Sequence, residues 1–268
     1  MKLSLGFSTC PNDTFMFDAM VHHRIDTEGL EFDLLMEDIL HLNQRALQGE
    51  LDILKISYNA YGHVRDQYQL LTSGSAMGQG CGPLLIASEP TSIEDLLQKN
   101  ARIAIPGHNT TANLLLSYFA PGLENRVEML FHEVMPAVQQ GKADAGLIIH
   151  ENRFTYPDYG LHCVQDLGEY WETKTGLPIP LGAICAHKRL GEETISKIDR
   201  VLRRSVEYAF AHPEASKGFV KEHAQELSPE VTKAHIALYV NDYSVDMGEK
   251  GREAVGKILE VGRGMGLY

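Results

Sequence analysis

The first residues of the chain predict a β-strand, a tight turn and a helix in immediate succession. Residues 2–7 alternate as a strand does, and residues 15–20 form an apolar run that suits a helix. The turn between them contains Pro11 and polar residues, which include Ser8, Asn12, Asp13 and Thr14. A helix that begins here directs unpaired backbone N–H groups toward the strand end, where an anionic ligand can bind. We expect an α/β fold, although the same turn occurs in α/β proteins that bind nothing there.

Composition limits the class of protein. The chain has 268 residues with 44% hydrophobic content, enough for one large domain or two modest ones. Its formal net charge of −12 and the lack of a basic stripe argue against nucleic-acid binding. An anionic small molecule would therefore have to be held by local donors, since the overall field repels it.

The four cysteines predict reduced thiols, with no metal site. They show no CxxC pairing and no histidine at zinc-ligand spacing, at Cys10, Cys81, Cys163 and Cys185. We also see no signal-peptide pattern and no apolar window long enough to cross a membrane. The expectation is a cytoplasmic protein without membrane insertion.

A lysine within an apolar strand is a candidate ligand contact. Residues 51–57 predict a strand buried on both faces, yet Lys55 lies inside it. A buried lysine needs a partner for its charge, and near the end of a parallel strand it would point into the ligand crevice. The alternative is an edge-strand lysine in water.

A second strand–turn–helix unit repeats the first. Residues 102–106 predict a strand and 113–119 a helix, joined by a small polar loop that contains Asn109, Thr110 and Thr111. The linker-like residues 89–92 and the returning strand 181–187 divide the chain into a larger domain, 1–89 with 183–268, and a smaller one, 90–182. We expect the two turns to face each other across a cleft that closes at hinges near 88–90 and 180–183.

His150 is the strongest candidate for chemistry among the 12 histidines. It follows an apolar run, residues 143–149, at the end where α/β folds place ligand-facing side chains. An imidazole takes up a proton near neutral pH, so His150 is a candidate general base. Glu151 would point to the opposite face if the strand continued through it. A purely structural histidine is the alternative.

Five segments together resemble one family. They are STCPNDTF at 8–15, CGPLL at 81–85, PGHNTTA at 106–112, IHENRFTY at 149–156 and YVNDYSV at 239–245. This combination resembles the MqnD family of 1,4-dihydroxy-6-naphthoate synthases, which belongs to the futalosine route to menaquinone. The resemblance covers essentially the whole chain. Thr9 and Asn152 depart from the residues that we expect there, proline and glycine, without removing a side chain of proposed chemical role.

The resemblance implies a fold and an activity. The fold is of the periplasmic-binding-protein type II, with two α/β domains joined by two crossovers and a ligand cleft between them. The activity is a lyase reaction in which cyclic dehypoxanthinylfutalosine yields 1,4-dihydroxy-6-naphthoate and dihydroxyacetone. The resemblance makes His150 the proton acceptor and places substrate contacts at Lys55, Ile56, Ser57 and the loop Asn109, Thr110, Thr111.

Further expectations concern partners. The substrate is a small-molecule carboxylate, and the sequence shows no motif for a metal or organic cofactor, such as GxGxxG or GK[ST]. The oligomeric state stays open, a homodimer included. Two other functions also remain open: a non-catalytic cytoplasmic ligand-binding protein of the same fold, and the related chorismate dehydratase.

Overall fold

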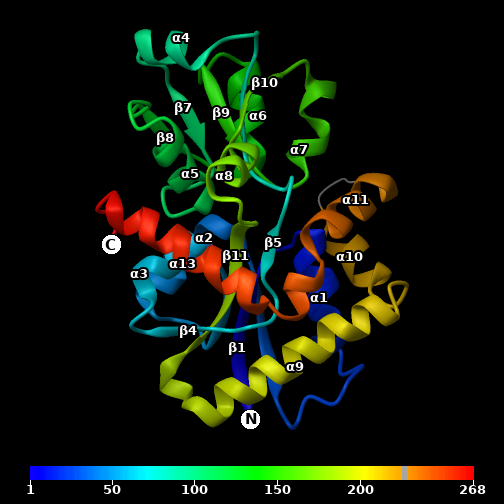
Figure 1. The fold of residues 1–268 in the computed structure, drawn as a ribbon. Helices are drawn as coiled ribbons and strands as arrows, with labels where there is room; N and C mark the ends of the chain where they lie inside the picture. Colours follow the sequence, from blue (N-terminus) through cyan, green and yellow to red (C-terminus); the bar gives the residue numbers. More distant parts are fainter. Residues whose placement is uncertain (225–227) are drawn as a thin grey trace.

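The protein consists of two lobes, each built on its own β-sheet (Figure 1). The computed structural model describes residues 1–224 and 228–268. In these residues the strands form one six-stranded and one five-stranded sheet. No helix in the described part of the chain has the length and apolar character needed to cross a membrane.

The first lobe contains the six-stranded sheet. Its strands, in spatial order, are β2 (Glu31–Met36), β1 (Lys2–Phe7), β3 (Ile53–Ser57), β11 (Ile179–His187) and β4 (Tyr68–Leu70), with β5 (Ala76–Gly78) also paired to β11. Strands β1, β2 and β3 are parallel, whereas β11 runs antiparallel to β3. A strand from the last third of the chain thus lies at the centre of a sheet begun by the first residues.

Helices from both ends of the chain cover this sheet. The early ones are α1 (Pro11–Val21), α2 (Ile39–Gln48) and α3 (Tyr58–Val64). Those after β11 are η2 (Lys188–Leu190), α9 (Glu192–Ala211), α10 (Lys217–His223), α11 (Pro229–Tyr239), α12 (Asp242–Val245) and α13 (Gly248–Gly264). Helix α1 packs between the sheet and α9, where Phe7 stacks on Phe17 with ring centroids 4.5 Å apart. Because α1 is buried, the turn before it is held firmly in place.

The second lobe contains the five-stranded sheet. Its spatial order is β10 (His162–Asp166), β6 (Leu84–Ala87), β9 (Ala145–Ile148), β7 (Ile103–Ile105) and β8 (Arg126–Glu128). Its helices are α4 (Ile93–Gln98), α5 (Thr111–Phe119), α6 (Phe131–Gln139), α7 (Asn152–Thr155), η1 (Tyr156–Tyr159) and α8 (Leu167–Thr175). The indole of Trp171 on α8 is buried and donates a hydrogen bond to the carbonyl of Pro178, 3.1 Å away. This contact anchors the chain as it leaves the lobe.

The chain passes between the sheets through residues 79–83 and again through 176–178. The crossover positions expected near 88–90 and 180–183 are therefore wrong by several residues. Strand β6, assigned to the larger domain from the sequence, pairs with β9 and β10 in the second sheet. Residues 89–92 form the turn before α4, whose N-terminus has a Ser92–Asp95 capping box. The division into two domains stays a prediction, and we propose boundaries at the two observed crossovers.

Both predicted strand–turn–helix units are present. Cys10 is the extended N-cap of α1, and Pro11 is its first residue. In the second unit Thr110 caps α5 because its hydroxyl accepts a hydrogen bond from the N–H of Asn113, 3.2 Å away. A proline at the first helical position of α1 and a side-chain cap at α5 therefore mark the two helix starts at the ends of buried strands.

The first crossover approaches α8 so closely that only glycine fits. A Cβ atom on Gly82 would lie 2.3 Å from Cα of Gly168 and 2.5 Å from its nitrogen. The carbonyl of Gly82 also accepts a hydrogen bond from Arg153, whose guanidinium pairs with Asp166. Backbone meets backbone here, so an added methyl group forces the crossover to move.

We therefore expect Gly82→Ala to lower the free energy of unfolding by about 1–3 kcal/mol in urea denaturation. Gly256 on α13 is the matched control, because an added Cβ there has no heavy atom within 4 Å. Gly256→Ala is expected to raise stability by up to about 1 kcal/mol through helix propensity. If Gly82→Ala and Gly256→Ala had the same free energy of unfolding, the crossover would have room for a side chain at position 82.

Candidate active site

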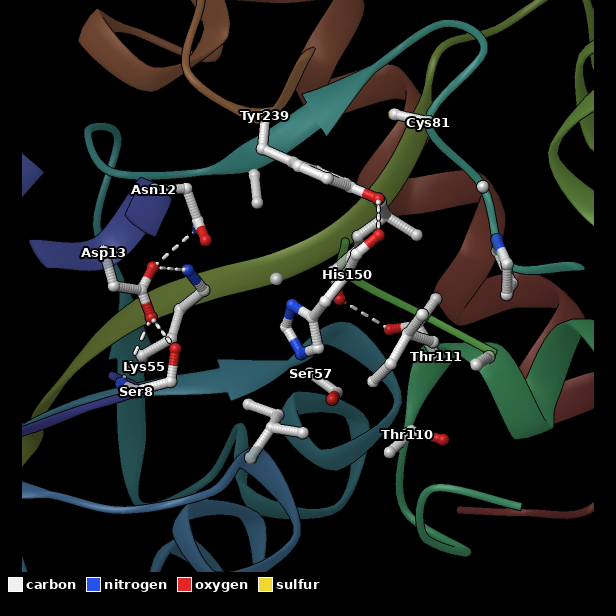
Figure 2. Close-up of a pocket in the computed structure, with 18 residues that line it drawn as sticks. Ser8, Asn12, Asp13, Lys55, Ser57, Cys81, Thr110, Thr111, His150 and Tyr239 are labelled. Atoms are coloured by element: carbon white, nitrogen blue, oxygen red, sulfur yellow. Dashed lines mark hydrogen bonds and ion pairs between the residues drawn. The ribbon is translucent and has the colours of Figure 1, made fainter. Parts of the chain in front are cut away.

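A cavity of about 630 Å³, its open mouth included, lies between the lobes and is lined by residues of both. The first lobe contributes Ser8, Asn12, Asp13, Ile39, Lys55, Ser57, Ala76, Leu181, Gly182 and Tyr239. The second lobe and the first crossover contribute Cys81, Gly82, Pro83, Thr110, Thr111, Ala112, Ile149 and His150. Figure 2 shows the labelled side chains gathered around the ring of His150. Its lining, which is mostly apolar with a few polar side chains, suits a small organic ligand.

Most predicted site residues meet at this cavity. Those that line it are Ser8, Asn12, Asp13, Lys55, Ser57, Thr110, Thr111 and His150. Thr14, Ile56 and Asn109 do not line it. The hydroxyl of Thr14 donates back to the carbonyl of Cys10, 3.2 Å away, and Ile56 packs into the apolar core on the other face of β3. Ile56 follows Lys55 on a strand, and Thr14 follows Asp13 on a helix, so their side chains point in other directions than those of the lining residues.

The charge of Lys55 is paired inside the protein. Its ammonium group contacts the carboxylate of Asp13, and the two residues are only 5% and 1% exposed. Strand β3 is internal to its sheet, so the alternative of an edge-strand lysine in water is wrong. Gly182 on the adjacent β11 makes room for the lysine, because a Cβ there would lie 2.6 Å from Cε of Lys55. The partner that the sequence required for this lysine is Asp13.

Asp13 is the centre of a dense hydrogen-bond cluster (Figure 2). Besides Lys55, its carboxylate accepts hydrogen bonds from the hydroxyl of Ser8 at 2.7 Å and from the N–H of Ser8 at 3.2 Å. It also accepts one from the side-chain amide of Asn12 at 2.8 Å. A carboxylate with this many donors is held in one orientation, so it fixes the lysine, the serine and the asparagine around it.

Across the cavity, the N-terminus of α5 offers donors to an anion. The hydroxyl of Thr110 serves as the cap, and the hydroxyl of Thr111 donates to the carbonyl of Leu181, 2.8 Å away. The backbone N–H groups of Thr111 and Ala112, the first two of the helix, have no acceptor among the described residues. Both residues line the cavity. Unpaired N–H groups and the helix dipole together suit a carboxylate.

His150 enters the cavity from a sharp turn after β9. Its φ of +57° is in the left-handed region, which costs a non-glycine residue about 1 kcal/mol or more. The ring packs on Phe131, with centroids 4.9 Å apart, and lies parallel to the ring of His235 at 6.2 Å. The hydroxyl of Tyr239 donates to the carbonyl of His150 at 3.3 Å. Contacts from both lobes thus hold the strained turn.

The His150 imidazole is neutral at physiological pH. Its pKa is lowered to about 4, mainly by burial; the carboxylate of Asp13 acts to raise the pKa and the positive charge of Lys55 to lower it. The unprotonated form is the one that can accept a proton from a ligand. This electrostatic setting suits a general base that is ready before substrate arrives.

The pH dependence of turnover tests whether the His150 imidazole is neutral. Because the neutral ring is the active form, kcat/KM should rise with pH through about 4 and level off by about pH 5. Initial rates measured in overlapping buffers, with stability checked at each pH, give the profile. An acid limb near 6.5, the ordinary histidine value, would show that burial does not set the pKa of the base.

Sequence reasoning missed three residues next to this site: Cys10, Glu151 and His235. Glu151 does not point to the opposite face, as it would if the strand continued, because β9 ends at Ile148 and the chain turns at His150. His235 is on α11, far along the chain from the segments it contacts, so no local spacing revealed it. Of the segments that carry the family resemblance, only YVNDYSV, which begins at Tyr239 on the same helix, lies close to His235 in the sequence.

Cys10, His150 and Glu151 form the one group in the described residues with metal-ligand geometry, with ligand-type atoms all within 4.8 Å of one another. The chemistry of the three does not fit a resident metal. Burial raises the pKa of the Cys10 thiol well above its usual range, so the thiol stays protonated, and raises the pKa of Glu151 to about 7, so its carboxyl group is only partly ionised near neutral pH. A metal would need the thiolate and the carboxylate. We therefore assign no metal to this group.

Comparison with known proteins decides the family. The family model for menaquinone biosynthesis matches residues 3–263. The chain belongs to the menaquinone biosynthesis family. A relative from Thermus thermophilus is 49% identical over 99% of this chain and 95% of its own length. Another from Streptomyces coelicolor is 46% identical over 99% and 94%. Both are named 1,4-dihydroxy-6-naphtoate synthase, and both bear out the resemblance predicted from the motifs.

Solved structures confirm the fold expected for this member of the menaquinone biosynthesis family. A protein from Archaeoglobus fulgidus superposes with a TM-score of 0.93 at 36% identity, covering 100% of this chain and 98% of its own. The periplasmic aliphatic sulphonate binding protein of Escherichia coli superposes with a TM-score of 0.67 at 11% identity, covering 99% and 88%. The α/β architecture of periplasmic binding proteins is therefore the fold of this chain.

Proposed function

We propose that this protein is a lyase of menaquinone biosynthesis that converts cyclic dehypoxanthinylfutalosine to 1,4-dihydroxy-6-naphthoate and releases dihydroxyacetone. The two synthases at 46–49% identity over nearly the full chain support this activity. The observation in the structure that carries it is the neutral imidazole of His150, which projects into the cavity between the lobes. A binding protein has no need of a half-buried, neutral base held in a strained turn.

In this proposal His150 removes a proton from the substrate, and the product gains an aromatic ring as the carbon–carbon bond breaks. The protein then has to bind the substrate, orient the leaving fragment and stabilise negative charge that develops on oxygen. The hydroxyl of Ser57 is available for that charge, since its oxygen accepts a hydrogen bond from Asn43 and its O–H has no acceptor among the described residues. No cofactor enters this scheme.

The substrate carboxylate is best accommodated at the N-terminus of α5. Lys55 was the first candidate from the sequence, but its charge is already matched by Asp13. The N–H groups of Thr111 and Ala112 face the same cavity without an acceptor in the described part of the chain. We therefore propose that Thr110, Thr111 and Ala112 bind the carboxylate, and that Lys55, Asp13, Ser8 and Asn12 shape the opposite wall.

The deciding experiment incubates purified protein with cyclic dehypoxanthinylfutalosine and follows the naphthoate by its absorbance. Formation of naphthoate with turnover supports the lyase. Binding of the substrate by calorimetry without product would favour a non-catalytic binding protein of the same fold. A parallel incubation with chorismate tests the related dehydratase, whose activity would overturn the proposal.

The free thiols and the cavity indicate the compartment and the kind of ligand. Cys10, Cys81, Cys163 and Cys185 are all free, which favours a reducing compartment, so we infer that the protein acts in the cytoplasm. The partner that the cavity suits is a small-molecule carboxylate, as expected from the sequence. A homodimer stays a prediction that light scattering on the purified protein can test.

A further inference from the structure

Two buried polar side chains face each other across the boundary between the lobes, outside the cavity itself. Glu151, in the turn after β9, is 7% exposed, and His235 on α11 is fully buried. Oε2 of Glu151 lies 3.8 Å from Nδ1 of His235, and neither atom has a hydrogen-bond partner among the described residues. A pair of unpartnered buried polar atoms aimed at each other is costly unless they share a proton.

The neighbouring hydrogen bonds determine where that proton must be. The side-chain nitrogen of Asn12 donates to the carboxylate of Asp13 at 2.8 Å, which orients the Asn12 oxygen toward His235. This oxygen can only accept, so Nε2 of His235, 2.9 Å away, must carry a hydrogen and donate it. A neutral imidazole with hydrogen on Nε2 has a lone pair on Nδ1. The group facing Nδ1 must therefore supply the proton.

We propose that Glu151 is a neutral carboxylic acid that donates a hydrogen bond to Nδ1 of His235, and that this contact between the lobes positions His150 for catalysis. The inference rests on the proposed lyase function. The separation of 3.8 Å is about 1 Å longer than such a hydrogen bond, and domain closure around substrate is the movement that shortens it.

The link to His150 is direct. Glu151 follows His150 in the chain, and the ring of His235 lies parallel to that of His150 with centroids 6.2 Å apart. One turn further along α11, the hydroxyl of Tyr239 donates to the carbonyl of His150 (Figure 2). Helix α11 of the first lobe therefore supports the base of the second lobe at its ring and at its backbone. Glu151 is a positioning residue here, since it does not line the cavity.

The charges around the pair agree with this assignment. Burial raises the pKa of Glu151 to about 7 and lowers the pKa of His235 well below its usual range. The titratable groups that face Glu151 are the protonated thiol of Cys10 from the start of α1, His150 from its own turn, and His235 and Tyr239 from α11. Lys55 and Asp13 lie beyond His150 and form a neutral pair. In the described part of the chain no cation lies close enough to this carboxyl group to favour its ionised form.

The contact between Glu151 and His235 should be lost as the pH rises. Below about pH 7 Glu151 keeps its proton and the contact is available. As pH rises through that value, the carboxylate faces a lone pair on Nδ1 and the contact is lost. The parent enzyme should therefore lose kcat on the alkaline side with an apparent pKa near 7, while KM changes less.

Glu151→Gln and Glu151→Leu separate this role from others. The glutamine keeps a neutral donor for Nδ1, so its kcat at about pH 6 should be within about threefold of the parent, without the alkaline loss. The leucine has no donor, so kcat should fall by about tenfold or more across the pH range. Equal losses in both variants, or an alkaline limb that survives in the glutamine variant, would overturn the proposal.

Infrared difference spectroscopy between the parent and Glu151→Gln tests the proton without any turnover. At about pH 6 the parent should show the C=O stretch of a protonated carboxyl group that the variant lacks, and this band should titrate away near pH 7. An ionised carboxylate at pH 6 would overturn the inference. A parent that shows the band but no turnover of cyclic dehypoxanthinylfutalosine would instead contradict the proposed function. The infrared and glutamine tests do not depend on whether the leucine variant folds.

Discussion

Replacing His150 by asparagine is expected to lower kcat by about a hundred- to ten-thousandfold, the usual contribution of a general base. Asparagine keeps the polarity and approximate shape of the imidazole and tolerates the left-handed backbone at this turn, where φ is +57°. Its side-chain amide cannot accept the substrate proton at physiological pH. Substrate affinity, measured by calorimetry, should be nearly unchanged because the proposed anchor is the N-terminus of α5.

His162 provides the matched control, since it is an exposed histidine on β10 of the same lobe and does not line the cavity. His162→Asn should turn over at the parent rate. If His150→Asn binds substrate and also turns over near that rate, His150 is structural and the base must be sought elsewhere in the cavity. Loss of binding together with kcat would instead make the ring a substrate anchor.

The second large effect concerns stability. Lys55→Met leaves the carboxylate of Asp13 buried without its cation, although the donors from Ser8 and Asn12 remain. Removal of one partner of a buried ion pair costs about 3–5 kcal/mol, so the free energy of unfolding in urea should fall by that order. The sequence alone makes Lys55 a substrate contact, and loss of such a contact would instead raise KM.

The double variant Asp13→Asn with Lys55→Met tests whether the unpaired charge of Asp13 causes the loss of stability. A neutral amide removes the unpaired charge, so much of the lost stability should return. Lys2→Met is the control, since Lys2 pairs with Asp33 at the surface with side chains 63% and 72% exposed, and it should change stability little. If Lys55→Met unfolds like the parent and raises only KM, Lys55 binds the substrate as first predicted.

Local signals allowed the sequence to predict the two turns that line the cavity. Strand alternation, Pro11 and small polar residues define the first, and the PGHNTTA segment defines the second. Both depend on interactions within a few residues, which a sequence displays directly. The left-handed turn at His150 also lies where an apolar run ends, so its position was visible even though its geometry was not.

Contacts between distant segments could not be predicted in the same way. The pairing of Lys55 with Asp13 was anticipated only as the need for some partner, and the approach of His235 to Glu151 depends on how α11 packs against the second lobe. The short strands β4 and β10 have little pattern of their own and depend on pairing with β11 and β6. The crossover after β5 was misplaced because Pro90 and Ser92 make an ordinary helix start look like a linker.

The order of strands in the first sheet has a consequence for synthesis on the ribosome. Strand β11 lies between β3 and β4, yet it is made only after the whole second lobe has emerged. The second lobe is one continuous segment and can complete its sheet early, whereas β3 presents an open edge until Gly182 comes to lie opposite Ser57. Open strand edges invite pairing with other chains. The nascent protein is therefore most exposed to aggregation, and most dependent on chaperones, in the interval between translation of β3 and of β11.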